Sequence, residues 1–135
     1  MKNMLKYILA LLIIVLAACK KDEHKIYYEG GTPPVLTASS TAPVVLDSNF
    51  KNQVAMKFSW TNPEYRFTTG VNSHDVVYIL EVDTVGANFT NPNKVEVSIA
   101  KDLEVTYTVK ELNALVSRLE LVENIPHDIE FRIKS

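Results

Sequence analysis

The clearest structural signal in this chain of 135 residues is the sequence Val54-Ala55-Met56-Lys57-Phe58-Ser59-Trp60-Thr61. Apolar side chains alternate in it with small or polar ones, and this period of two is typical of a strand with one buried face. Asn62-Pro63 follows and ends the strand, because proline has no N–H to donate to a sheet. Trp60 continues the apolar face, so we expect it to be buried in the core of a β domain and not to form a sugar platform.

The same alternation predicts four further main strands, at 75–83, 95–99, 105–109 and 129–133. Segment 75–83 is largely apolar on both faces, which indicates a central position in a sheet. Residues 35–37 and 44–46 predict an edge strand that Pro43 interrupts. Short strands at regular spacing, separated by turn signals, predict an all-β sandwich of the immunoglobulin or fibronectin type III kind.

One short helix is expected between the fourth and fifth main strands. Thr108 followed three residues later by Glu111 is a capping-box pattern, which favours the start of a helix. Apolar residues then recur at helical spacing, at Leu112, Leu115, Val116 and Leu119. The sequence therefore predicts an amphipathic crossover helix within the sandwich.

The amino terminus has the pattern of an export signal. Lys2 and Lys6 precede an apolar run from residue 8 to residue 18, which ends in Leu16-Ala17-Ala18-Cys19. A membrane-spanning helix is the alternative, but it needs about 20 consecutive apolar residues and this run is shorter. The ending resembles the lipobox of bacterial lipoproteins, which implies a signal peptide over 1–18 and an acylated Cys19 as the first mature residue. As Cys19 is the single cysteine, no disulfide can form within the chain.

Residues 19–33 have the composition of a flexible tether. Paired glycines at 30–31 and prolines at 33–34 oppose a regular helix. The charged residues 20–23 resemble the export signal of surface-displayed lipoproteins, and a solvated linker is the equally simple interpretation. Tyr27 and Tyr28 interrupt this polar run, and the sequence leaves open whether they dock on the domain.

Composition excludes several functions for the remaining domain of about 100 residues, which can form one core. Removal of 1–18 takes away two lysines and no acid, so the formal charge moves from −2 to −4. An acidic body without a basic cluster argues against nucleic-acid binding. His24, His74 and His127 lie far apart and are interpreted as surface or turn residues, so no metal site is expected. No nucleophile with a base is visible, so we expect neither catalysis nor a cofactor.

Four segments together resemble the amino-terminal module of the SusE-type starch-utilisation lipoproteins: Phe58 to Thr61, Tyr78 to Asp83, Tyr107 to Asn113 and Glu130 to Lys134. The resemblance covers 34–135. It implies an immunoglobulin-like module that holds carbohydrate-binding domains away from the outer membrane. It also implies lipid anchoring at the cell surface, a TonB-dependent transporter and other glycan-binding lipoproteins as partners, and a polysaccharide ligand.

The chain stops at Ser135, after the strand that would be sixth in a seven-stranded sandwich. We therefore expect the last strand to be missing, because the sequence is either a fragment or the product of a truncated reading frame. In the family the glycan is held largely by later domains, so its ligand residues have no counterparts here. One edge of the last predicted strand should then lack a partner.

The one candidate glycan contact within the chain is Tyr65 with Phe67, in the long turn after Trp60. Exposed aromatic rings can stack on sugars, although such a pair can equally cover the end of the core. Two functions remain open on the sequence. The first is a spacer module in a glycan-uptake complex, and the second is an adhesion or scaffold lipoprotein without a sugar ligand.

Overall fold

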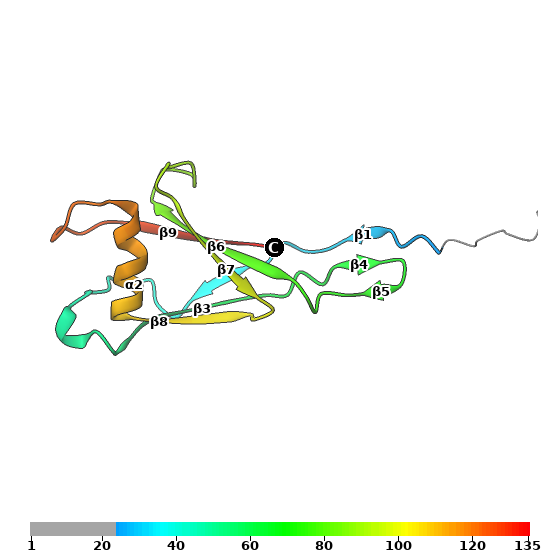
Figure 1. The fold of residues 1–135 in the computed structure, drawn as a ribbon, viewed down its shortest axis with the longest axis horizontal. Helices are drawn as coiled ribbons and strands as arrows, with labels where there is room; N and C mark the ends of the chain where they lie inside the picture. The colour runs from blue at the N-terminus through cyan, green and yellow to red at the C-terminus, as the bar shows by residue number, and fades with distance from the viewer. Residues whose placement is uncertain (1–23) are drawn as a thin grey trace, which may run out of the picture.

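The computed structural model describes residues 24–135. Its strands are β1 (Tyr28–Gly30), β2 (Leu36–Ala38), β3 (Val54–Trp60), β4 (Arg66–Phe67), β5 (Gly70–Val71), β6 (Val77–Thr84), β7 (Val95–Ala100), β8 (Glu104–Thr108) and β9 (Ile129–Lys134). Its helices are α2 (Val109–Val116) and the 3₁₀ turns η1 (Ser48–Phe50) and η2 (Ser117–Leu119). Figure 1 shows an elongated molecule in which α2 lies at one end and β1, β4 and β5 at the other.

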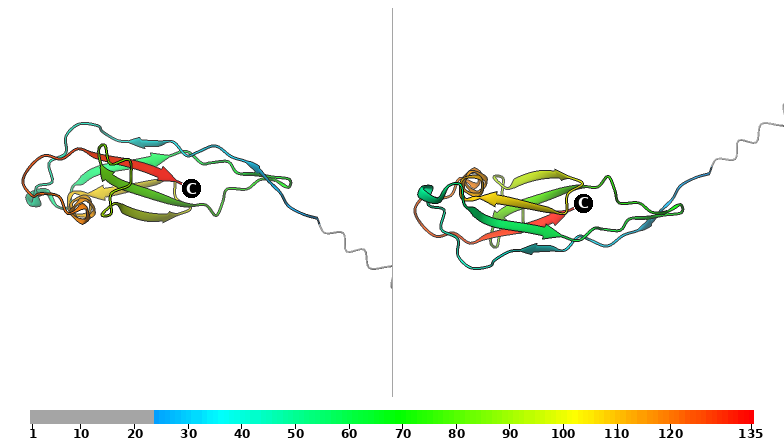
Figure 2. Two further views of the ribbon diagram at one scale, coloured as in Figure 1. Left: turned by 90° about the horizontal axis from the view of Figure 1, so that it is seen from above. Right: turned by 90° about the horizontal axis from the view of Figure 1, so that it is seen from below.

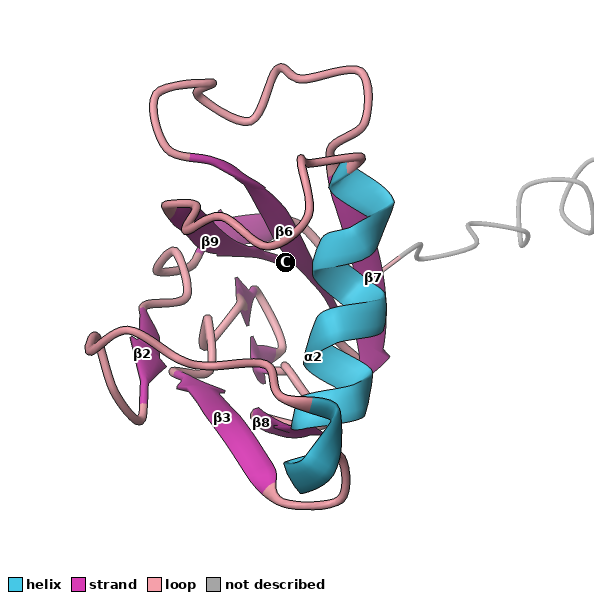
Figure 3. Ribbon diagram, turned by 90° about the vertical axis from the view of Figure 1, so that its left-hand side faces the viewer, coloured by secondary structure: helices cyan, strands magenta, loops and turns pink. Residues whose placement is uncertain are grey.

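Two antiparallel sheets form the body of the molecule, with strand orders β2-β3-β8 and β7-β6-β9. They lie on opposite sides of one core, and α2 covers the gap between them on one side (Figure 3). Phe58 and Tyr78 are both 1% exposed and Leu80 is fully buried. The predicted all-β sandwich with one crossover helix is therefore confirmed.

Strand β6 occupies the centre of its sheet, as the sequence predicted. Leu80 faces Val97 of β7 and Ile133 of β9, and all three point into the core. The outer face of β6 is less apolar than expected, because Glu81 and Asp83 lie on it with no exposed surface. Strand β9 pairs with β6 alone, so within residues 24–135 its other edge has no strand partner.

The capping box at the start of α2 is present. The Thr108 side chain accepts a hydrogen bond from the Glu111 N–H, and the Glu111 carboxylate accepts one from the Thr108 N–H at 2.8 Å. Val109 was predicted as the end of a strand, and this was wrong. It is the first residue of the helix, because the cap at Thr108 turns the backbone, and its side chain is buried by helical packing instead.

The predicted edge strand is confirmed only in its first half. Strand β2 pairs with β3 from Leu36↔Trp60 to Ala38↔Phe58. Residues 44–46 form no strand, and Val45 is 80% exposed. Pro43 lacks the N–H that a continued ladder needs, and Asp47 caps η1 directly afterwards, so the chain leaves the sheet.

A third, small sheet with the order β1-β4-β5 extends from the sandwich. Figure 2 shows these strands running away from the two main sheets, toward the side where the chain enters. We call this part, residues 26–32 with 63–73, the extension. It includes part of the segment that composition indicated to be a tether, because β1 forms a ladder with β4 there.

Candidate functional site

Three aromatic rings pack together on the extension. Tyr28 of β1 lies opposite Phe67 of β4. The Tyr28 ring meets the Phe67 ring edge-on at 5.7 Å between centroids and the Tyr65 ring edge-on at 5.8 Å. Tyr65 and Phe67 are half-buried by this packing, whereas Tyr28 is 60% exposed. The structure thus brings the two predicted residues together and adds a third that the sequence left undecided.

Close backbone contacts hold this cluster in place. The N–H of Thr32 donates to the carbonyl of Pro63 at 2.8 Å, and the N–H of Tyr65 donates to the Ser73 hydroxyl at 2.6 Å. At Gly31 a Cβ atom would lie 2.5 Å from Cδ1 of Tyr65 and 2.9 Å from the Pro63 carbonyl oxygen. Only glycine therefore fits at this position. The Tyr65 hydroxyl also shares a 2.6 Å hydrogen bond with the Ser135 hydroxyl, which joins the extension to the end of β9.

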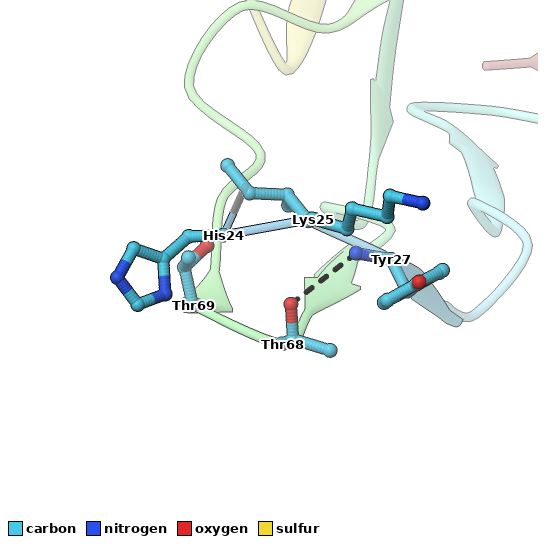
Figure 4. Close-up of a pocket in the computed structure, with 6 residues that line it drawn as sticks. His24, Lys25, Tyr27, Thr68 and Thr69 are labelled. Carbon is cyan, nitrogen blue, oxygen red and sulfur yellow. Dashed lines mark hydrogen bonds between the residues drawn. The ribbon is translucent and has the colours of Figure 1, made fainter. Parts of the chain in front are cut away.

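An open hollow of about 490 Å³ lies at the tip of the extension. Its lining residues are His24, Lys25, Ile26, Tyr27, Thr68 and Thr69 (Figure 4). The N–H of Tyr27 donates to the Thr68 hydroxyl at 3.2 Å, and the N–H of Thr68 donates to the Tyr27 carbonyl at 3.0 Å. These two bonds fix the chain before β1 against the β4–β5 turn. None of the lining residues within 24–135 is acidic.

A second polar feature lies on the outer face of the β7-β6-β9 sheet. The buried Glu81 carboxylate accepts hydrogen bonds from Lys94 at 2.7 Å and from Nε of Arg132 at 2.6 Å, and Lys134 lies 2.9 Å away. Burial by itself raises the pKa of Glu81, but the hydrogen bonds from the three cations outweigh it and lower the pKa to about 2. Glu96 pairs with Lys94 at 2.8 Å and extends the network.

The loop after β6 covers this network from one side. Asp83 accepts hydrogen bonds from the N–H groups of Thr84 at 2.8 Å and Asn91 at 3.3 Å, and so it closes the loop. Phe89, held at φ 56°, places its ring 4.1 Å from the Arg132 guanidinium. Glu81 and Glu96 form ion pairs with Lys94, Arg132 and Lys134, and these pairs link β6 to β9 and to the residue before β7.

The remaining predicted site residues fall as follows. Cys19 lies outside the described residues. The three histidines are far apart: His24 lines the tip hollow, His74 lines a separate shallow hollow, and Nε2 of His127 is 2.7 Å from the Val122 carbonyl oxygen. Residues 24–135 contain no group of three side chains that could hold a metal ion. None of the helices among them is long and apolar enough to cross a bilayer.

The fold defines an immunoglobulin-like β-sandwich module that carries an aromatic strand extension. The family model for the SusE outer membrane protein matches residues 20–134, and the chain therefore belongs to the SusE outer membrane protein family. This is a family of surface binding lipoproteins, and membership places the protein at the outer membrane within a starch-utilisation system. Curated proteins and solved structures give no significant match.

Proposed function

We propose that this chain is the membrane-proximal spacer of a glycan-binding lipoprotein, with residues 1–18 as signal peptide and Cys19 as the acylated terminus. One observation carries the proposal. The extension projects from the sandwich on the side where the described chain begins at residue 24 (Figure 1), so it would add length between the sandwich and an anchor at Cys19. The polysaccharide would then be bound by domains that follow the module. The TonB-dependent transporter and other surface lipoproteins of the system would be its partners.

Within this proposal the rings of Tyr65 and Phe67 have a structural role. Tyr28 packs against both of them, and the Tyr65 hydroxyl is bonded to Ser135. Rings that are half-buried in this way offer little free face for a pyranose to stack on. Native gels containing amylopectin test this directly: the spacer should migrate unretarded. Retardation that is lost in Tyr65→Ser or Phe67→Ser would instead make the pair a sugar contact.

The anchor is tested on protein extracted from membranes. Mass spectrometry should find acylated Cys19 as the first residue, and Cys19→Ser should leave the membrane fraction. An intact Met1, or a Cys19→Ser protein that remains equally bound, would refute this part.

The alternative function, a scaffold lipoprotein without a sugar ligand, predicts the same anchoring. In that case cells that lack the gene would bind starch as well as the parent strain does.

A further inference from the structure

Four large apolar or aromatic side chains of the extension are exposed, on both of its faces. Ile26, Tyr27, Tyr28 and Val71 are 62%, 59%, 60% and 61% exposed. A single exposed hydrophobic residue needs no explanation. Here two of the four are tyrosines, whose rings have an apolar body and a polar end and are enriched where membranes meet water.

The position of the tip in the chain brings it close to the anchor. Seven peptide units separate Cys19 from Ile26, and even a fully extended chain of that length spans only roughly 25 Å. An acyl group on Cys19 would keep the first mature residue at the bilayer surface. The tip is therefore the described part of the molecule that the anchor holds nearest to the lipid.

The charges at the tip suit a lipid headgroup. The described residues that line the hollow include Lys25 and His24 and the hydroxyl groups of Thr68 and Thr69, and none of these residues carries a carboxylate. An ammonium group and hydroxyl donors match the oxygens of a phosphate, which every phospholipid headgroup carries. Apolar rings beside a cation are also the combination found where proteins lie on membrane surfaces.

We propose that the tip of the extension docks into the headgroup layer of the membrane, with Ile26 and Tyr27 in the interface and Lys25 toward the lipid phosphates. This rests on the proposed Cys19 anchor. The anchor attaches the protein to the membrane, and the contact at the tip sets the orientation of the module. It can do so because the ladder of β1 with β4 and the Tyr27–Thr68 hydrogen bonds hold the residues at the tip rigidly to the rest of the extension. The long axis of the module then stands away from the bilayer.

Depth-dependent quenching tests the contact. The acylated protein is reconstituted in vesicles of phosphatidylethanolamine and phosphatidylglycerol, with or without bromine on the acyl chains, and tryptophan fluorescence is measured. The reporter variant is Tyr27→Trp. The matched control is Val122→Trp, which is exposed to a similar degree (68%, against 59% for Tyr27) but lies in the loop after η2, at the end of the molecule opposite the extension. The parent protein gives the background from buried Trp60.

Brominated lipid should quench the reporter at residue 27 and shift its emission to the blue, and should leave the control unchanged. Adding Ile26→Ser and Val71→Ser to the reporter should reduce its quenching, whereas mere closeness to the anchor would leave it the same. Equal quenching at residues 27 and 122, or no effect of the two serines, would overturn the proposal. Mass spectrometry of the same sample reports the acyl group, so a failed anchor is recognised separately.

Discussion

The carboxylate of Glu81 has no exposed surface and is ionised because Lys94, Arg132 and Lys134 surround it. Each of these cations keeps between 23% and 45% of its side chain exposed. The cluster is therefore only partly removed from water. Removal of the carboxylate should therefore lower the free energy of unfolding by less than about 3–5 kcal/mol, which is the loss seen when a fully buried ion pair is broken.

The first prediction is an acid-dependent stability that Glu81 carries. Its pKa in the folded protein is about 2, below its ordinary value of 4.5, so its contribution is fully present above pH 4.5 and is lost as the pH falls toward 2. Urea unfolding between pH 6 and pH 2 should show this loss. Glu81→Gln should be less stable at pH 6 and should have a flatter pH dependence. Glu96→Gln, at an exposed partner of Lys94, is the control, and an unchanged slope in Glu81→Gln would contradict the assignment.

Trp60 is 5% exposed and packs at 5.6 Å from the Tyr78 ring, as the sequence led us to expect for a core residue. Its indole Nε1 is buried without a hydrogen-bond partner in the described structure. Trp60→Ala should lower the free energy of unfolding by about 3–5 kcal/mol. Trp60→Phe should cost clearly less, because it keeps most of the ring and removes the unpaired donor. Unfolding in guanidinium measures both, and equal losses would contradict the assignment of the stabilisation to packing of the ring.

Among the elements, α2 depends on its amino-terminal cap. Thr108→Ala removes the side-chain acceptor for the Glu111 N–H and should lower the free energy of unfolding by about 1 kcal/mol. Thr106→Ala, at an exposed position on the same strand, should change it by much less. Thermal or urea unfolding of the two variants makes the comparison. A Thr108→Ala protein as stable as the Thr106→Ala control would mean that the cap contributes nothing.

The extension depends on the close approach at Gly31. Gly31→Ala forces a methyl group against Tyr65 and the Pro63 carbonyl, and overpacking of this kind costs about 1–3 kcal/mol. The cost should appear as opening of the extension, so the amide hydrogens of Tyr27 and Thr68 should exchange faster. Thr69→Ala in the nearby turn is the control. The amide of Leu80 in the sandwich should be unaffected, and a general rise in exchange would instead indicate damage to the core.

Across the whole molecule, stability should be uneven. The sandwich has a continuous core, whereas the extension is a narrow ribbon whose rings remain partly exposed. Local opening is expected first where few apolar groups are buried. Hydrogen exchange should therefore protect the amide of Val82 far more than those of Thr68 and Asn72, which bond to carbonyls within the extension. Equal protection would show that the extension and the sandwich unfold as one unit.

The main strands and the helix start could be predicted because each rests on a local pattern. The apolar residues from Val54 to Trp60 alternate with a period of two, which predicts a strand. Thr108 and Glu111 are three positions apart, which predicts a helix start. The small sheet could not be predicted in this way. Strands of two or three residues have no measurable period, and Tyr28 finds Phe67 only after the chain has folded back on itself.

For the candidate site, the residue types and their spacing in the sequence were enough to select Tyr65 and Phe67 as a pair and Trp60 as a core residue. It could not show that Tyr28 packs on that pair, nor that Lys94, Arg132 and Lys134 meet at Glu81. Side-chain type and spacing are properties of neighbours along the chain, so they are visible in the sequence. Which strands lie side by side, and in which register, depends on the packing of the whole domain, and that register is what brings these distant groups into contact.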